Sequence, residues 1–218
     1  MNNKMKKILK WLKRHKACNA GYNYSTQFTD PADWWDSFDR GDWMLWVIWR
    51  AIDRKDEKEL RKITLVKAKC ANLFRHLMKD VRSKKAIDIA LKYGKGLASK
   101  EELENAAVAA YAAAVAANAD TAVAAYAANA AAVAAYAAAV AANADTAVTT
   151  YASANADTAY AAAVAAYASA NADADAYDIA QKEILKKSAD IVREHYSIQD
   201  VLQRILPTTF SRKENNEL

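Results

Sequence analysis

The sequence predicts an all-α protein, a multi-helix bundle, on the strength of three observations. Its 218 residues include only four Gly and two Pro, too few for the turns of a sheet sandwich or barrel. Apolar residues recur at the spacing of three and four that marks one face of a helix. Alanine, the strongest helix former, dominates residues 106–176. Because alanine buries little area, the core must depend on larger residues, above all the six Trp and eleven Tyr.

The first element expected is a basic amphipathic helix near the N-terminus. Met5, Ile8, Leu9 and Leu12 share one side of it, and Lys and Arg residues cover the other sides. We expect residues 1–29 to form a basic arm and loop, docked through this apolar stripe. A membrane surface or a partner helix is the alternative occupant of the stripe. The apolar residues are too interrupted by charge for a signal peptide, and no stretch is long enough to span a bilayer.

Two helices rich in tryptophan should follow. Asp30 and Pro31 predict an N-cap and a first helical residue. A cap at Asp42 then predicts a helix over residues 43–52, apolar on almost every side, as is typical of a buried helix. Five of the six tryptophans lie between residues 34 and 49, so the main cluster of large side chains is expected here.

These aromatic residues permit two interpretations. In the first they form the hydrophobic core, and Arg50 pairs with a nearby aspartate. In the second they form an aromatic box that stacks a flat ligand while arginines hold its anionic group. The candidate ligand-binding residues are Trp34, Trp35, Arg40, Trp43, Trp46, Arg50 and Tyr93.

A strongly basic segment comes next. A helix is predicted over residues 57–81, with Leu60, Ile63 and Cys70 in its apolar stripe and Lys67 among the lysines of its outer sides. A shorter helix is expected over residues 84–93. Fifteen basic residues against five acidic ones between residues 54 and 100 give this pair a positive surface.

Two capping signals divide this basic segment from the alanine-rich one. Gly94 is placed to end the shorter helix in a left-handed conformation. Ser99 and Glu102 form the sequence pattern of a capping box, which predicts that a new helix begins there.

The alanine-rich segment contains an exact internal duplication. Residues 106–123 recur unchanged at residues 131–148, a shift of 25 positions or about seven helical turns. We expect closely packed repeat helices, punctuated by Val and Tyr, whose Ala/Tyr faces also offer a surface for self-association. Four Asn-Ala-Asp sites, at residues 118–120, 143–145, 155–157 and 171–173, supply the expected helix breaks.

The predicted organisation is one helical domain with an uneven charge. Residues 30–206 form the domain, composed of a Trp-rich basic half (30–104), the repeat half (105–178) and closing helices (179–206), followed by a polar tail at 207–218. Residues 1–104 carry 24 Lys and Arg against 14 Asp and Glu, whereas residues 105–178 carry six Asp and no basic residue. We therefore expect the surface that binds an anionic partner to lie in the first hundred residues.

The sequence offers no recognisable catalytic, metal or cofactor motif. The three histidines are dispersed, and no Gly-rich phosphate loop is present. We therefore expect a protein that is not an enzyme. Cys18 and Cys70 match no metal or redox spacing, which favours two reduced, buried thiols and a cytoplasmic protein.

Several motifs together resemble a family of helical immunity proteins from bacteria and tailed phages. The resemblance spans about residues 31–196. It rests on Arg40-Gly41-Asp42-Trp43-Met44-Leu45-Trp46, on Ala-Ile-Asp-Ile-Ala at 86–90 with Tyr93-Gly94-Lys95-Gly96, on the Ser99 capping box and on residues 188–196. It implies an all-helical fold and a setting in the conflict between phage and bacterium, in the host cytosol if the protein is phage-encoded.

The leading functional hypothesis is a non-enzymatic binding protein, acting in immunity or counter-defence. It would neutralise its partner by sequestration, and basic charge beside Trp and Tyr favours an anionic nucleotide signal as that partner. The first alternative is a protein inhibitor or immunity protein that binds a toxin or defence effector. The second is a structural or ice-binding role for the alanine-rich helices, although their threonines share no regular helical register.

Overall fold

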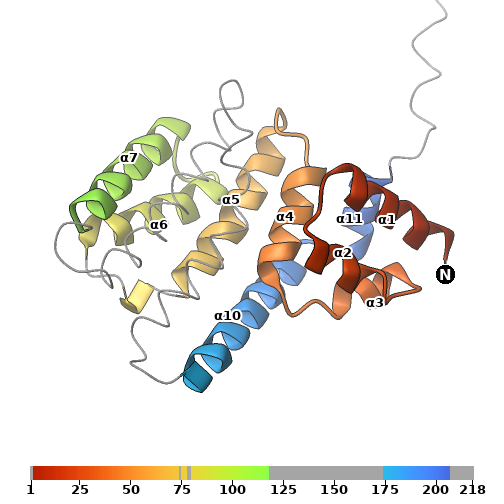
Figure 1. Ribbon diagram of the computed structural model, residues 1–218. Coiled ribbons are helices and arrows are strands. Elements are labelled where there is room, and N and C mark those ends of the chain that lie inside the picture. The colour runs from red at the N-terminus through yellow and green to blue at the C-terminus, as the bar shows by residue number, and fades with distance from the viewer. Residues whose placement is uncertain (1, 74, 78–79, 118–173, 207–218) are drawn as a thin grey trace, which may run out of the picture. The chain divides into compact units, whose positions relative to one another are not determined.

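The computed structural model describes residues 2–73, 75–77, 80–117 and 174–206, and every regular element in these ranges is a helix. Figure 1 shows the helices in chain order, from α1 in dark red to α11 in blue. The predicted all-α bundle is confirmed for this part of the chain. The chain divides into two compact units: unit 1 is Met1–Phe38 with Tyr196–Leu218, and unit 2 is Asp39–His195.

Unit 1 joins the N-terminal helices to α11, the last helix that the structure describes. It contains α1 (Asn3–Arg14), α2 (Asn19–Ser25), α3 (Pro31–Asp36) and α11 (Ile198–Ile205). Helix α1 packs against α2, and α11 packs against α3. The sequence predicts a boundary at residue 29, whereas the first segment of unit 1 extends to Phe38. The reason is that α3, which carries two tryptophans, packs against α11.

Helix α2 was not expected, since residues 21–29 lack helical periodicity. The thiol of Cys18 caps it, because Cys18 Sγ accepts a hydrogen bond from the Gly21 amide at 3.4 Å. At the other end, Ser25 Oγ donates to the Gly21 carbonyl at 2.8 Å. The Cys18 cap satisfies one amide of the first turn, and hydrophobic patterning alone does not predict a helix that begins at such a cap.

The core of unit 1 is built on two adjacent tryptophans of α3. Trp34 is 0% exposed and its indole N–H donates to Ser25 Oγ at 2.9 Å. Trp35 is 1% exposed and donates to the Tyr196 carbonyl at 3.0 Å. Phe38 meets the Trp34 ring edge-on at a centroid distance of 5.2 Å. Both indoles thus combine apolar burial with a satisfied polar atom.

Unit 2 is a set of packed helices that includes α4 (Gly41–Ala51) and α7 (Lys100–Ala117). Helix α10 (Ala174–His195) packs against both α4 and α5 (Glu57–Asn72), and α6 (Val81–Gly94) packs against both α5 and α7. The expected capping box begins α7: the Ser99 amide donates to Glu102 Oε2 at 2.7 Å, and the Glu102 amide donates to Ser99 Oγ at 3.1 Å.

Two glycines allow this close packing. A Cβ atom on Gly41 would lie 2.5 Å from Ser188 Cβ and 2.6 Å from the Ala189 nitrogen, so α4 and α10 approach backbone to backbone. A Cβ atom on Gly94 would lie 2.5 Å from Leu65 Cβ. The expectation that Gly94 ends its helix in a left-handed conformation is wrong, because Gly94 is the last residue of α6 and the positive φ, 76°, belongs to Gly96.

The helix predicted over residues 57–81 is shorter than expected, and the helix predicted over residues 84–93 corresponds to α6, which begins three residues earlier. Helix α5 ends at Asn72, a 3-10 turn covers Arg75–Leu77, and α6 begins at Val81. The Asp80 carboxylate caps α6 by accepting the Arg82 amide at 2.7 Å. The apolar spacing continues through this region, but the N-cap at Asp80 starts a new helix there.

Most of the exact duplication falls outside the described residues. Helix α7 includes its start, as far as Ala117, and all four Asn-Ala-Asp sites lie in the range 118–173 that is not described. The expected helix breaks, the Ala/Tyr self-association surface and the ice-binding alternative therefore remain sequence predictions. Among the helices that are described, none combines the length and apolarity needed to cross a membrane.

Candidate functional site

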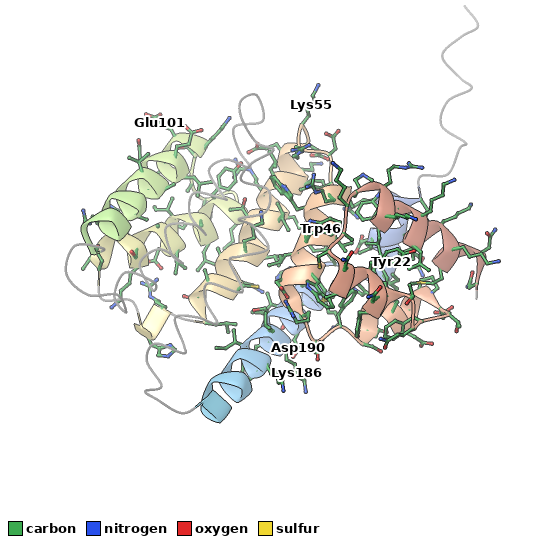
Figure 2. The ribbon with its side chains drawn as sticks, viewed as in Figure 1. Tyr22, Trp46, Lys55, Glu101, Lys186 and Asp190 are labelled. Carbon is green, nitrogen blue, oxygen red and sulfur yellow. The ribbon has the colours of Figure 1, made fainter. Side chains whose placement is uncertain are left out.

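The candidate site is a line of four residues along one side of α4. Arg40, Trp43, Trp46 and Arg50 follow one another at spacings of three and four, which places them on one face of the helix. We call these four residues the α4 stripe. Arg40, Trp43 and Trp46 are partly buried and Arg50 is exposed, whereas Met44, Leu45, Val47, Ile48 and Trp49 of the same helix are buried. Figure 2 shows the side chains of α4, with Trp46 labelled.

Within the α4 stripe, each arginine stacks on one tryptophan. The guanidinium carbon of Arg40 lies 4.5 Å from the centre of the Trp43 ring. The guanidinium carbon of Arg50 lies 5.8 Å from the centre of the Trp46 ring. Both distances fall in the range where a cation is attracted to an aromatic face. The stripe therefore presents two guanidinium–indole pairs in sequence along one helix.

The two arginines differ in their electrostatic environment. Arg40 makes two hydrogen bonds to Asp42, including Nε to Oδ1 at 2.9 Å, and Asp42 is buried. Asp42 is thus not the helix cap expected from the sequence, since the N-cap is Arg40 without a side-chain cap bond. Arg50 forms no ion pair with any residue that the structure describes, so the expected pairing with a nearby aspartate is not found. Its charge remains available to an anion.

The arrangement suits a ligand that is both flat and anionic. Indole faces stack on planar rings, and a guanidinium binds a phosphate or carboxylate through two parallel hydrogen bonds. Arg50 has the exposure for this, and Trp46 beside it supplies the aromatic surface. Arg50 does not act as a general acid or base, because arginine keeps its proton in proteins, and the indole of Trp46 only donates a hydrogen bond.

Three of the seven predicted ligand-binding residues do not join the α4 stripe. Trp34 and Trp35 form the core of unit 1, with both indole N–H groups bonded inside that unit. Tyr93, on α6 of unit 2, is 0% exposed. The first interpretation, a structural core, therefore describes these three residues, and the second remains open only for the stripe.

Tyr93 is held in a polar arrangement of its own. Its hydroxyl donates to Glu57 Oε1 at 3.0 Å, and the Arg61 guanidinium carbon lies 4.4 Å from its ring centre. Burial, together with the Glu57 carboxylate, raises the pKa of Tyr93 to about 12. Arg61 also donates to the Tyr93 carbonyl at 2.8 Å. These contacts fasten α5 to α6 and leave the ring no face for a ligand.

A lysine on α5 is buried, contrary to the sequence prediction. Lys67 was expected on the outer sides of its helix, but it is 1% exposed, and its Nζ atom lies 4.1 Å from the centre of the Trp49 ring. Burial lowers the pKa of Lys67 to about 7. The signal was present in the sequence: Lys67 follows Ile63 by four and precedes Cys70 by three, which puts it within the apolar stripe.

Other buried polar atoms of unit 2 lie on α5, α6 and α10. Among the described residues, Thr64 Oγ1, Ser83 Oγ, Ser188 Oγ and His195 Nε2 have no hydrogen-bond partner. The Cys70 thiol donates a long bond, 3.9 Å, to the Ser188 carbonyl, and burial raises the pKa of Cys70 to about 12. Such a thiol is inert.

The two cysteines and the metal-ligating residues support no further site. Both thiols are free, but Cys18 is exposed, which corrects the expectation that both are buried. In the described ranges, no group of three His, Cys, Asp or Glu side chains could hold a metal ion.

Comparison with known proteins finds no relative. No family model, curated protein or solved structure matches this chain. The features of this chain that bear on function are the α4 stripe and the motifs of its sequence.

Proposed function

We propose that this chain is a non-enzymatic protein that binds and sequesters an anionic nucleotide at the α4 stripe. The observation that carries the proposal is the exposed guanidinium of Arg50, which stacks on Trp46 and forms no ion pair with a described residue. An arginine that stacks on a partly exposed indole presents a positive charge next to an aromatic ring. A nucleotide has the matching pair of groups, a charged phosphate and a flat base.

The neighbouring pair extends this surface. Trp43 lies about one helical turn before Trp46 and presents a second ring, and Arg40, stacked on Trp43, presents a second guanidinium. Asp42 already neutralises much of the Arg40 charge. We therefore assign the main anionic contact to Arg50, and to Arg40 the role of holding the Trp43 ring in place.

The proposed setting is the conflict between phage and bacterium. This part of the proposal is supported by the motif resemblance. Some of the motif residues are explained by their role in packing or capping the helices. Gly94 is required by its close approach to Leu65, and Ser99 by its cap on α7. The segment from Arg40 to Trp46 includes Gly41, which the contact with α10 requires, and two partly exposed tryptophans, each paired with an arginine. These tryptophans favour a binding role for the segment.

The test is calorimetric titration with a panel of linear and cyclic nucleotides, using Arg50→Gln as the diagnostic variant. Loss of a guanidinium–phosphate contact should weaken binding at least tenfold, because a charged hydrogen bond contributes roughly 1.5–3 kcal/mol. Arg82→Gln is the matched control, since Arg82 is exposed and, within the described ranges, forms its ion pair with Asp80, the N-cap of its own helix. Equal affinities of the two variants, or no binding by any nucleotide, would refute the proposal.

The second candidate is a protein partner, a toxin or defence effector. Partly exposed Trp and Arg residues on one helix face are also the residue types that dominate protein interfaces. A protein interface would depend more on Trp43→Ala and Trp46→Ala than on Arg50→Gln. Free nucleotides would not compete with such a partner, which separates the two candidates.

A further inference from the structure

The outer face of α1 carries the densest positive charge in unit 1. Five basic residues lie on an arc of about 120°, reckoned at 3.6 residues per turn. All five are exposed, and we call them the α1 basic face: Lys6, Lys7, Lys10, Lys13 and Arg14. Nitrogen tips project along α1, which is labelled in Figure 1 and drawn in pale red in Figure 2.

The opposite side of α1 is fixed in the core of unit 1. Its apolar residues Met5, Ile8, Leu9, Trp11 and Leu12 are 0–8% exposed. The expectation that this helix docks through its apolar stripe is confirmed. As a result, the basic face is held on a packed helix, and no large apolar side chain of α1 is left for insertion into a bilayer.

The charge of this face is not compensated locally. The first acidic residue of the chain is Asp30, so residues 1–29 contain none. None of the five basic residues forms an ion pair with a described residue, although ion pairs are frequent elsewhere, as at Arg75 with Asp88. Asp30 itself is engaged in capping α3, where it accepts the Ala32 amide at 2.8 Å.

We propose that the α1 basic face binds the phosphate backbone of a double-stranded nucleic acid, without reading its sequence. Residues 6–14 span about 12 Å of helix, and a duplex carries about seven phosphate charges over the same length. Five side chains at helical spacing can therefore neutralise several adjacent phosphates. This surface lies in unit 1, apart in sequence from the α4 stripe of unit 2, so it is a second function independent of nucleotide binding.

Duplex nucleic acid fits this face better than a lipid surface does. Helices that lie in a membrane interface insert their apolar face among the acyl chains, and here that face is occupied by the protein core. Phosphate contacts need only charged donors on a scaffold that holds them in place. An anionic vesicle is therefore the contrasting probe.

The experiment measures binding of a labelled 20-base-pair DNA by fluorescence anisotropy between 50 and 200 mM salt. About five phosphate contacts predict a slope of log affinity against log salt of roughly −4 to −5. The variant Lys6→Gln/Lys10→Gln/Lys13→Gln should reduce that slope in magnitude by about 2.7 and weaken binding at low salt.

The matched control is Lys55→Gln/Lys58→Gln/Lys85→Gln, which removes the same charge from exposed positions of unit 2. It should keep the slope of the unmodified protein. Circular dichroism melting of both variants checks that each is folded. The proposal is overturned by no duplex binding at 50 mM salt, by equal losses in the two triple variants, or by tighter binding to vesicles with 30% phosphatidylserine than to DNA.

Discussion

The guanidinium of Arg40 lies between two partners, with its carbon 4.5 Å from the centre of the Trp43 ring and its nitrogens bonded to the Asp42 carboxylate. This contact joins a buried aspartate to a partly exposed indole through one cation. Asp42 fixes the arginine in place but offsets its charge. The two arginine–tryptophan pairs of the α4 stripe are therefore unequal in their expected contribution to anion binding.

Substituting Asp42→Asn should raise the affinity for an anionic ligand while lowering the stability of the protein. The amide keeps the size of the side chain but no longer neutralises Arg40, so a bound phosphate gains a second cation. Loss of a charged hydrogen bond at a buried site should cost roughly 1.5–3 kcal/mol of unfolding free energy. Calorimetric titration and denaturant unfolding measure the two effects, and unchanged affinity would show that Arg40 takes no part in binding.

Substituting Gly41→Ala should destabilise the protein by about 1–3 kcal/mol, as overpacking does. The added Cβ atom would lie 2.6 Å from the Ala189 nitrogen and from the Ser188 carbonyl carbon, and backbone atoms cannot move aside as a side chain can. In an open helix the same change stabilises by about 1 kcal/mol. The sign of the change in melting temperature therefore decides whether α4 and α10 are in backbone contact.

The buried Lys67 should make stability depend on pH. Its pKa is about 7 in the folded protein because of burial, and near 10.5 when the chain is unfolded. Between these values the unfolded state binds more protons, so stability rises with pH, and below pH 7 the full penalty of burying the charge is present.

The variant Lys67→Met isolates this effect. It should be more stable than the natural protein at pH 7 by about 1–4 kcal/mol, because an apolar side chain of similar length replaces a buried charge. The advantage should shrink as pH rises from 7 to 8.5, a range below the region in which Tyr93 and Cys70 titrate. A stability difference between the two proteins that stays constant across this range would contradict a lowered pKa for Lys67.

The two thiols should react at very different rates. Cys18 is exposed, whereas Cys70 is buried and its pKa is raised to about 12. A thiol reagent such as Ellman's should therefore label one cysteine of the folded protein quickly and the second only after denaturation. Rapid labelling of both in native buffer would mean that the contact between α5 and α10 around Cys70 opens readily.

Capping and periodicity made most of the helices predictable. The Asp30–Pro31 start and the Ser99 and Glu102 box appear in the structure where the sequence places them. Each is a bond between residues two or three positions apart, so it depends on no distant part of the fold. Helix α2 was missed because its cap is the Cys18 thiol, an uncommon residue for that role.

The candidate site was only partly predictable, for a physical reason. Tryptophan serves equally well as a core residue and as a stacking surface, and composition does not separate the two uses. Trp34 and Trp35 are core residues because α3 packs on the last helix of the chain, a long-range contact that no local pattern encodes. Trp43 and Trp46 share one partly exposed face only because the opposite faces of α4 are buried.

The most direct test of nucleotide binding at the α4 stripe is a nuclear magnetic resonance titration of the indole N–H signals. The signals of Trp43 and Trp46 should shift on addition of the nucleotide that binds. Those of Trp34 and Trp35, bonded to Ser25 and to the Tyr196 carbonyl inside unit 1, should stay in place. Shifts confined to Trp34 and Trp35, or none with any nucleotide of the panel, would contradict the account.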